Sequence, residues 1–262
     1  MYLPLLLTRD DDDDVRVLPN VCRHRGATLE REAAGCKRVF TWVIAEPDVA
    51  HMPGIDARIG ALGADFDWIG LPDHRIAAIE QIDIAANWKL LIEGGLEAYH
   101  FRVAHKDTIG PYFPDNLLIW QSFGPHIRAM LPRNSMPDLG DAPEADWHLR
   151  RDANLVYLMM VNTQPLVQQD HVMWFHFEPV SEALTRVRMA TLVPNSAPRT
   201  PEMQAHWDKN QRITVIALME DFELGEEIQS GFASRGNPSH LFGRFEGALD
   251  RFNRVVEEMI AG

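Results

Sequence analysis

The residues with the clearest chemical potential lie in the stretch 97–105, which reads EAYHFRVAH. A carboxylate, Glu97, stands three residues before His100, and a second imidazole, His105, follows five residues after the first. Two neutral imidazoles and one carboxylate from elsewhere would form the facial triad that holds Fe(II) and leaves positions open for O₂ and substrate. The spacing therefore predicts part of a mononuclear iron site.

The spacing of the two histidines also constrains the local backbone. In a continuous helix, five residues at about 100° each would place the imidazoles roughly 140° apart. Both can reach one metal only if the helix ends or distorts between them, and Val103-Ala104 is the natural place. The alternative is that each histidine is an ordinary core or surface residue of an amphipathic helix.

A third ligand is predicted on a long helix near the C-terminal end. Apolar residues step by four, four, three and four around one carboxylate, in the series Ile213, Ala217, Asp221, Leu224 and Ile228. A buried carboxylate is costly unless it is paired or binds a metal, so Asp221 is the expected third ligand, unless it lies at the edge of the stripe and reaches water. Its acidic neighbours are expected on a solvated face: Glu220, Glu223, Glu226 and Glu227.

The residues around these ligands resemble those of a known family. The segments NWKLLIE at 87–93, EDFELGEEIQSG at 220–231 and VRVLPNVCRHRGA at 15–27 resemble the large (α) subunits of Rieske non-haem iron oxygenases. The resemblance implies that His100, His105 and Asp221 bind Fe(II). It also implies that Glu97 is the acid that links the iron to an iron–sulfur cluster in a neighbouring subunit.

The cluster-binding half of the resemblance is incomplete. A Rieske [2Fe–2S] centre needs two cysteines and two histidines. Cys22 and His24 fit the family's first Cys-x-His pair, but the chain passes from Thr41 straight to Trp42 where the Cys-x-x-His pair should stand. The other candidates have simpler interpretations: Cys36 as a small buried residue and His51 as a loop residue. We therefore expect an incomplete cluster site.

The same resemblance suggests the domain organisation and the fold. We expect an incomplete Rieske-like β domain at 1–75 and an α+β catalytic domain at 76–262, with 76–86 as the remainder of a linking stretch. Pro- and Gly-bounded segments rich in β-branched and aromatic residues predict strands at 117–123, 126–131, 154–161, 164–168, 171–178 and 185–193. Helical segments are expected near 90–105, from 198–201 to about 230, and at 243–260. Such an order suits a helix-grip (START/Bet v 1-like) fold, an antiparallel sheet curved around a long C-terminal helix.

Composition restricts the class of protein. The chain has 262 residues with 46% hydrophobic content, enough for a substantial core, and its net charge of −13 argues against nucleic acid or an anionic membrane as partner. Two cysteines predict a reducing compartment, hence the cytoplasm, and no apolar run approaches a membrane span. The acid run at 10–14 is expected to be a hairpin loop, because it lacks the spacing and glycine of a calcium loop.

The family resemblance implies O₂-dependent hydroxylation of an aromatic or related small organic substrate, or oxidation of a small amine. Electrons would come from an NADH-dependent reductase or ferredoxin through the [2Fe–2S] cluster of an adjacent subunit in a homotrimer. The alternative function is a helix-grip ligand-binding protein that lacks electron transfer and keeps the cavity, with or without the iron.

Overall fold

The computed structural model describes residues 5–9, 15–19, 59–234 and 241–261, and the chain divides into two compact units, 1–60 and 61–262. In the first unit, β1 (Leu5–Arg9) pairs antiparallel with β2 (Val15–Pro19). This pairing confirms the hairpin predicted on either side of the acid run, whose own residues lie outside the described ones.

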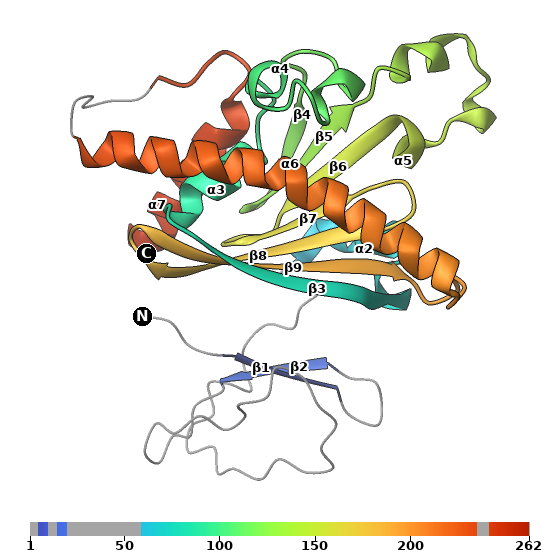
Figure 1. Cartoon of the computed structure of the whole chain (residues 1–262), viewed down its shortest axis with the longest axis horizontal. Coiled ribbons are helices and arrows are strands. Elements are labelled where there is room, and N and C mark those ends of the chain that lie inside the picture. The colour runs from blue at the N-terminus through green and yellow to red at the C-terminus, as the bar shows by residue number, and fades with distance from the viewer. Residues whose placement is uncertain (1–4, 10–14, 20–58, 235–240, 262) are drawn as a thin grey trace. The chain divides into compact units, whose positions relative to one another are not determined.

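The second unit is built on a seven-stranded antiparallel sheet of order β3-β9-β8-β7-β6-β5-β4 (Figure 1). Every neighbouring pair in this order is antiparallel. The strands are β3 (His74–Ile84), β4 (Ile119–Phe123), β5 (His126–Pro132), β6 (Ala153–Leu158), β7 (Thr163–Val167), β8 (Val172–Ser181) and β9 (Leu184–Pro194).

Six of these strands confirm the sequence predictions to within a few residues at each end. The seventh corrects an expectation, because residues 76–86 are not a linker remnant. They belong mostly to β3, the edge strand that pairs with β9 along its whole length. Ile76 and Ile79 are exposed on this edge. Because apolar side chains of β3 also lie on the exposed side, its sequence does not alternate regularly between apolar and polar residues. Such alternation is the pattern that predicts a half-buried strand, so β3 was not predicted.

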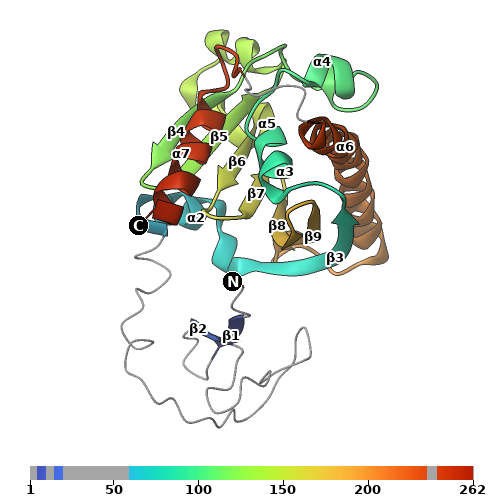
Figure 2. The same ribbon diagram turned by 90° about the vertical axis from the view of Figure 1, so that its left-hand side faces the viewer.

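Helices pack on both faces of the sheet. They are α2 (Gly63–Ile69), α3 (Trp88–Gly94), α4 (Phe101–Ala104), α5 (Leu149–Asp152), α6 (Pro201–Ala233) and α7 (Gly247–Ala261). Short 3₁₀ turns occur at Gly60–Leu62, Leu71–Asp73, Gly110–Tyr112, Met136–Asp141 and Glu144–Asp146. The helix α6 runs across the strands, and α3 lies between α6 and α7 (Figures 1 and 2). The predicted α+β fold with a long C-terminal helix is confirmed.

The core joins the sheet to these three helices. Ile92 on α3, Phe222 on α6 and Phe252 on α7 are all at most 2% exposed and belong to one cluster with Phe177 and Met189 of the sheet. Burial of large apolar side chains is the main stabilising contribution in such an arrangement. The packing fixes the rotation of α6 about its axis and hence the direction in which its polar residues point.

The buried face of α6 differs from the predicted stripe. Ala217 is buried as expected, but Ile213 and Ile228 are 46% and 47% exposed, and the face is completed by Thr214 and Phe222 instead. The observed face is therefore rotated from the predicted one. Asp221 still lies on it, with a side chain that is 19% exposed.

Within the described residues, no helix is both long and apolar enough to cross a membrane.

The close packing of α6 on α3 generates a testable prediction at Gly225, one turn after Asp221. A Cβ there would lie 2.8 Å from Cδ2 of the buried Leu91, whereas at Gly231 on the same helix it would meet nothing within 4 Å. In a helix, Gly→Ala normally stabilises by roughly 0.5–1 kcal/mol, but overpacking a core costs about 1–3 kcal/mol. Gly225→Ala should therefore have a free energy of unfolding at least ~1 kcal/mol below that of Gly231→Ala in urea denaturation. Equal stabilities of the two variants would contradict this packing.

Candidate metal centre and adjacent cavities

The two histidines reach a common point because the helix between them is short. The helix α4 spans only Phe101–Ala104, with His100 before it and His105 after it in a non-helical conformation (φ −97°, ψ 20°). The predicted helix end at Val103-Ala104 is confirmed. As a result the two Nε2 atoms lie 3.1 Å apart.

Asp221 completes a triangle of potential ligand atoms. Its Oδ1 lies 3.0 Å from Nε2 of His100 and 2.9 Å from Nε2 of His105. Within the described residues, these three form the cluster that could hold a metal ion. On one face of an octahedron, sides of about 3 Å correspond to ion–ligand bonds of about 2.1 Å, a typical length for imidazole and carboxylate ligands.

A second carboxylate stands behind each imidazole. Glu97 contacts Nδ1 of His100 and also accepts a hydrogen bond from the backbone N–H of Tyr99. Glu220 lies 2.6 Å from Nδ1 of His105 and accepts a hydrogen bond from Thr108 Oγ1 at 2.7 Å. Such contacts fix the orientation and tautomer of a metal-binding imidazole.

The contact made by Glu220 corrects the expectation that it belongs to a solvated face. Its side chain is 28% exposed and points to His105, which is 1% exposed. Position 220 precedes Asp221 directly, so helical geometry places it about 100° away. The periodicity of the sequence correctly placed Glu220 outside the apolar stripe. It could not indicate that the imidazole of His105, from a distant segment, lies beside Glu220.

The donor and acceptor pattern tests whether a cation fits. With a carboxylate at each Nδ1, the proton of a neutral imidazole is favoured on that nitrogen, and Nε2 presents a lone pair. Both Nε2 lone pairs then face Asp221 Oδ1, which is buried and has no hydrogen-bond partner of suitable geometry among the described residues. With both imidazoles neutral, three acceptors thus converge, and a divalent cation fits this arrangement.

The charged groups around the metal-free site also favour a positive charge at its centre. Burial alone lowers the pKa of His100, but Asp221 and Glu97 outweigh burial and raise that pKa to about 9. The pKa of His105 is likewise raised, by Asp221 and Glu220 against burial. Burial would raise the pKa of Asp221, but the two histidines lower it. The carboxylates thus favour positive charge at the centre, whether carried by protons or by a metal ion.

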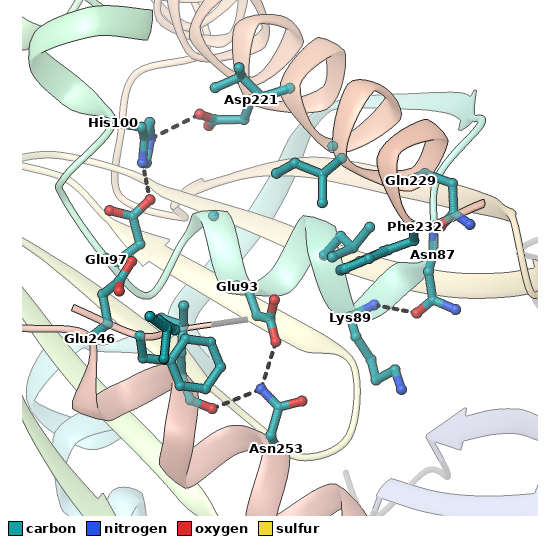
Figure 3. A pocket seen from close by; sticks show the side chains of 18 of the residues that line it. Asn87, Lys89, Glu93, Glu97, His100, Asp221, Gln229, Phe232, Glu246 and Asn253 are labelled. Carbon is teal, nitrogen blue, oxygen red and sulfur yellow. Dashed lines mark hydrogen bonds and ion pairs between the residues drawn. The ribbon is translucent and has the colours of Figure 1, made fainter. Parts of the chain in front are cut away.

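Cavities lie on two sides of the triad, and Glu97 and Asp221 line both. One has a volume of about 140 Å³, is bordered by His105 and is mostly apolar. The other has a volume of about 860 Å³, is bordered by His100 and carries several acidic side chains (Figure 3): Glu93, Glu97, Glu182, Asp221 and Glu246. The smaller cavity has the apolar lining and few polar groups typical of a site for a small organic molecule.

The remaining candidates from the sequence cannot be placed. Cys22 and His24, the two expected cluster ligands, lie outside the described residues, as do Cys36 and His51.

Comparisons with solved structures show the same fold in several oxygenases. A quaternary ammonium Rieske monooxygenase, described with carnitine oxidation and inter-subunit electron transfer, is 16% identical with a TM-score of 0.69, over 98% of this chain and 82% of that one. Naphthalene 1,2-dioxygenase from Rhodococcus sp. is 14% identical with a TM-score of 0.68, over 97% and 83%. Dicamba monooxygenase is 15% identical with a TM-score of 0.53, over 98% and 90%.

At these identities the structural likeness establishes the fold alone. No curated protein matches the sequence. The family comparison goes further, because residues 73–262 match the family described as ring hydroxylating alpha subunit (catalytic domain). The matched region is well over half of the 262 residues and contains the whole triad. The chain therefore belongs to the family of ring-hydroxylating oxygenase alpha subunits.

Proposed function

We propose that this chain is an O₂-dependent oxygenase that binds one Fe(II) through His100, His105 and Asp221 and hydroxylates an aromatic or related small organic substrate. The observation that carries the proposal is the convergence of two imidazole nitrogens and a carboxylate oxygen at the wall of a small apolar cavity. Family membership supports the reaction class.

The side chains have separable roles in this proposal. His100, His105 and Asp221 would hold the ion, and Glu97 and Glu220 hold the imidazoles in orientation through their Nδ1 atoms. When bound, the iron would supply the site at which O₂ is activated. Apolar side chains of the cavity exclude water and hold the carbon to be oxidised beside the ion: among them Phe101, Leu131, Val156, Phe175 and Phe177.

Hydroxylation with O₂ requires two electrons from outside, because none of the three ligands is redox-active. We propose that an NADH-dependent reductase or ferredoxin is their source and that the subunits associate as a homotrimer, as the resemblance implies. The low cysteine count supports a location in the cytoplasm. Cys22 and His24 offer half of the four ligands that a Rieske cluster needs. Turnover therefore depends on completion of this electron path.

The alternative of a helix-grip ligand-binding protein without electron transfer is not favoured. The match to the catalytic domain of a hydroxylating family and the ligand triad beside the cavity both support an enzyme.

The first test of the site is His105→Ala. Removing one of three ligands should reduce bound iron from about one per chain to less than a tenth of that after anaerobic loading with Fe(II), measured by elemental analysis. His148→Ala, at an exposed position outside the site, is the matched control and should bind iron normally. Equal iron in both variants would rule out the assignment of His105.

A second prediction concerns the carboxylate behind His105. Glu220→Gln keeps the size of the side chain but removes its charge, so iron affinity should fall by roughly 10- to 100-fold, the effect typical for a carboxylate that orients a metal-binding histidine. Glu223→Gln, on the exposed face of the same helix, should leave affinity unchanged. Competition with a chelator of known affinity gives the measurement. If both variants match the unaltered protein, Glu220 has no orienting role.

A third prediction concerns the cluster. Because the chain lacks the Cys-x-x-His pair, Cys22 and His24 should not hold a stable [2Fe–2S] centre. Anaerobically reconstituted protein should contain no acid-labile sulfide and lack the reduced-state EPR spectrum of a Rieske cluster. Two sulfides per chain together with that spectrum would show that other residues complete the ligand set.

A further inference from the structure

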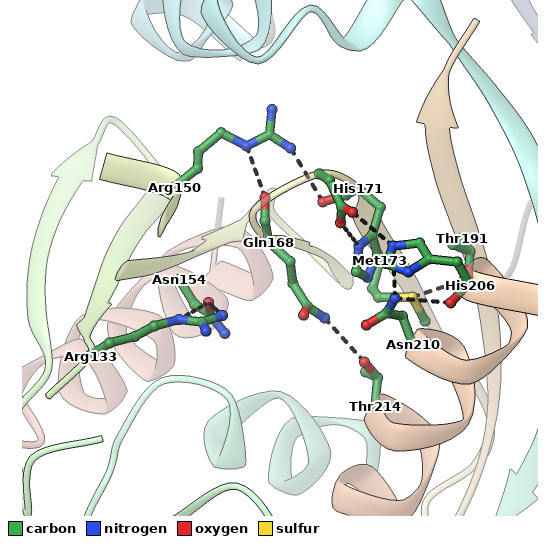
Figure 4. Close-up of polar contacts among 11 residues, drawn as sticks. Arg133, Arg150, Asn154, Gln168, His171, Met173, Thr191, His206, Asn210 and Thr214 are labelled. Atoms are coloured by element: carbon green, nitrogen blue, oxygen red, sulfur yellow. Dashed lines mark hydrogen bonds and ion pairs between the residues drawn. The ribbon is translucent and has the colours of Figure 1, made fainter. Parts of the chain in front are cut away.

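The small cavity is polar at the end away from the triad. Asn154 on β6, Gln168 after β7 and Thr214 on α6 all line it there (Figure 4). Thr214 precedes Asp221 by two helical turns, so it lies about 10 Å along α6 from the metal-binding end. Apolar side chains separate the two ends. A molecule in the cavity would therefore meet the iron site with one end and these polar groups with the other.

Among the described residues, the hydrogen bonds at this end leave the amide nitrogen of Asn154 available as a donor. Asn154 Oδ1 accepts hydrogen bonds from Arg133, at 3.3 Å from Nε and 2.8 Å from Nη2. Gln168 Nε2 donates to Thr214 Oγ1 at 3.1 Å. Within the described part of the chain, the amide nitrogen of Asn154 makes no hydrogen bond. With its carbonyl side turned to Arg133, the NH₂ group of Asn154 remains to donate to a ligand.

Arg133 places a positive charge directly behind Asn154. Its guanidinium is half-buried and lies 5.9 Å from the ring centre of Phe113, another cavity-lining residue. Among the described residues, no carboxylate oxygen forms an ion pair with Arg133, and the buried Asp152 nearby is paired with Arg151 at 3.0 Å. Removal from water lowers the pKa of Arg133, with partial compensation from Asp152. A half-buried cation without a paired anion is costly, and an anionic ligand would offset that cost.

We propose that this end of the cavity binds the anionic group of the substrate, a carboxylate that accepts from Asn154 Nδ2 in the field of Arg133. The inference rests on the proposed function, which it deepens by naming the substrate as a small aromatic carboxylate. The cavity volume of about 140 Å³ matches a single ring, because an engineered apolar cavity of about 150 Å³ binds benzene. The ring lies on the apolar walls between Asn154 and the iron.

The test compares benzoate with its neutral isostere benzamide by calorimetric titration of the anaerobic, Fe(II)-loaded protein. Benzoate should bind at least about tenfold more tightly than benzamide, the difference expected from one charge-assisted hydrogen bond.

Three variants test the assigned residues. Asn154→Asp is nearly isosteric, pairs with Arg133 and repels a carboxylate. It should therefore abolish the preference for benzoate and leave the affinity for benzamide unchanged. Asn195→Asp introduces the same charge at an exposed position and should keep the preference. Arg133→Gln retains a hydrogen-bond donor for Asn154 but removes the positive charge. It should weaken the binding of benzoate and leave the binding of benzamide unchanged.

Equal affinities of the unaltered protein for benzoate and benzamide would overturn the proposal. So would a benzoate preference that survives Asn154→Asp, because the carboxylate would then bind elsewhere, for example to the iron. Iron is measured in the same samples. A full iron content without the preference contradicts this inference alone, whereas the preference in protein that binds no iron contradicts the proposed function alone.

Discussion

Two imidazole nitrogens and a carboxylate oxygen lie within 3.1 Å of one another in a largely buried space. Such a group of acceptors requires a positive charge among them, and the surrounding structure strengthens that requirement. Glu97 and Glu220 contact the far nitrogens of both imidazoles and so increase the negative charge around the centre. Without a metal, protons meet the requirement, as the raised pKa of His100 indicates.

The fold forms the metal-binding triad by bringing together segments that are more than a hundred residues apart in the sequence. The early end of α4 turns His105 back toward His100, and the packing of α6 on the sheet and on α3 directs Asp221 to the same point. The close approach at Gly225 allows α6 to come near α3 just beyond the ligand. The apolar cavity begins where these elements meet, so the metal-binding groups and the substrate space share one wall.

The sequence predicted much of this arrangement, because its patterns are local. The histidine spacing identified both imidazoles and required a helix end at Val103-Ala104, and alternating or apolar segments located six strands. Other features depend on contacts that no local pattern contains. The edge strand β3 is exposed and only weakly patterned, and the rotation of α6 that exposes Ile213 and Ile228 is set by core packing. Glu220 and Asn154 acquire roles only through partners distant in the chain, His105 and Arg133.

The triad of His100, His105 and Asp221 is expected to hold one metal ion. Diffraction from a crystal grown anaerobically with Fe(II) would locate this ion, with anomalous differences recorded above and below the iron absorption edge. We expect a single strong peak, present only above the edge, at about 2.2 Å from Nε2 of His100, Nε2 of His105 and a carboxylate oxygen of Asp221. Full iron loading with no anomalous peak among these three residues, or with the peak at another position, would show that the triad does not hold the iron.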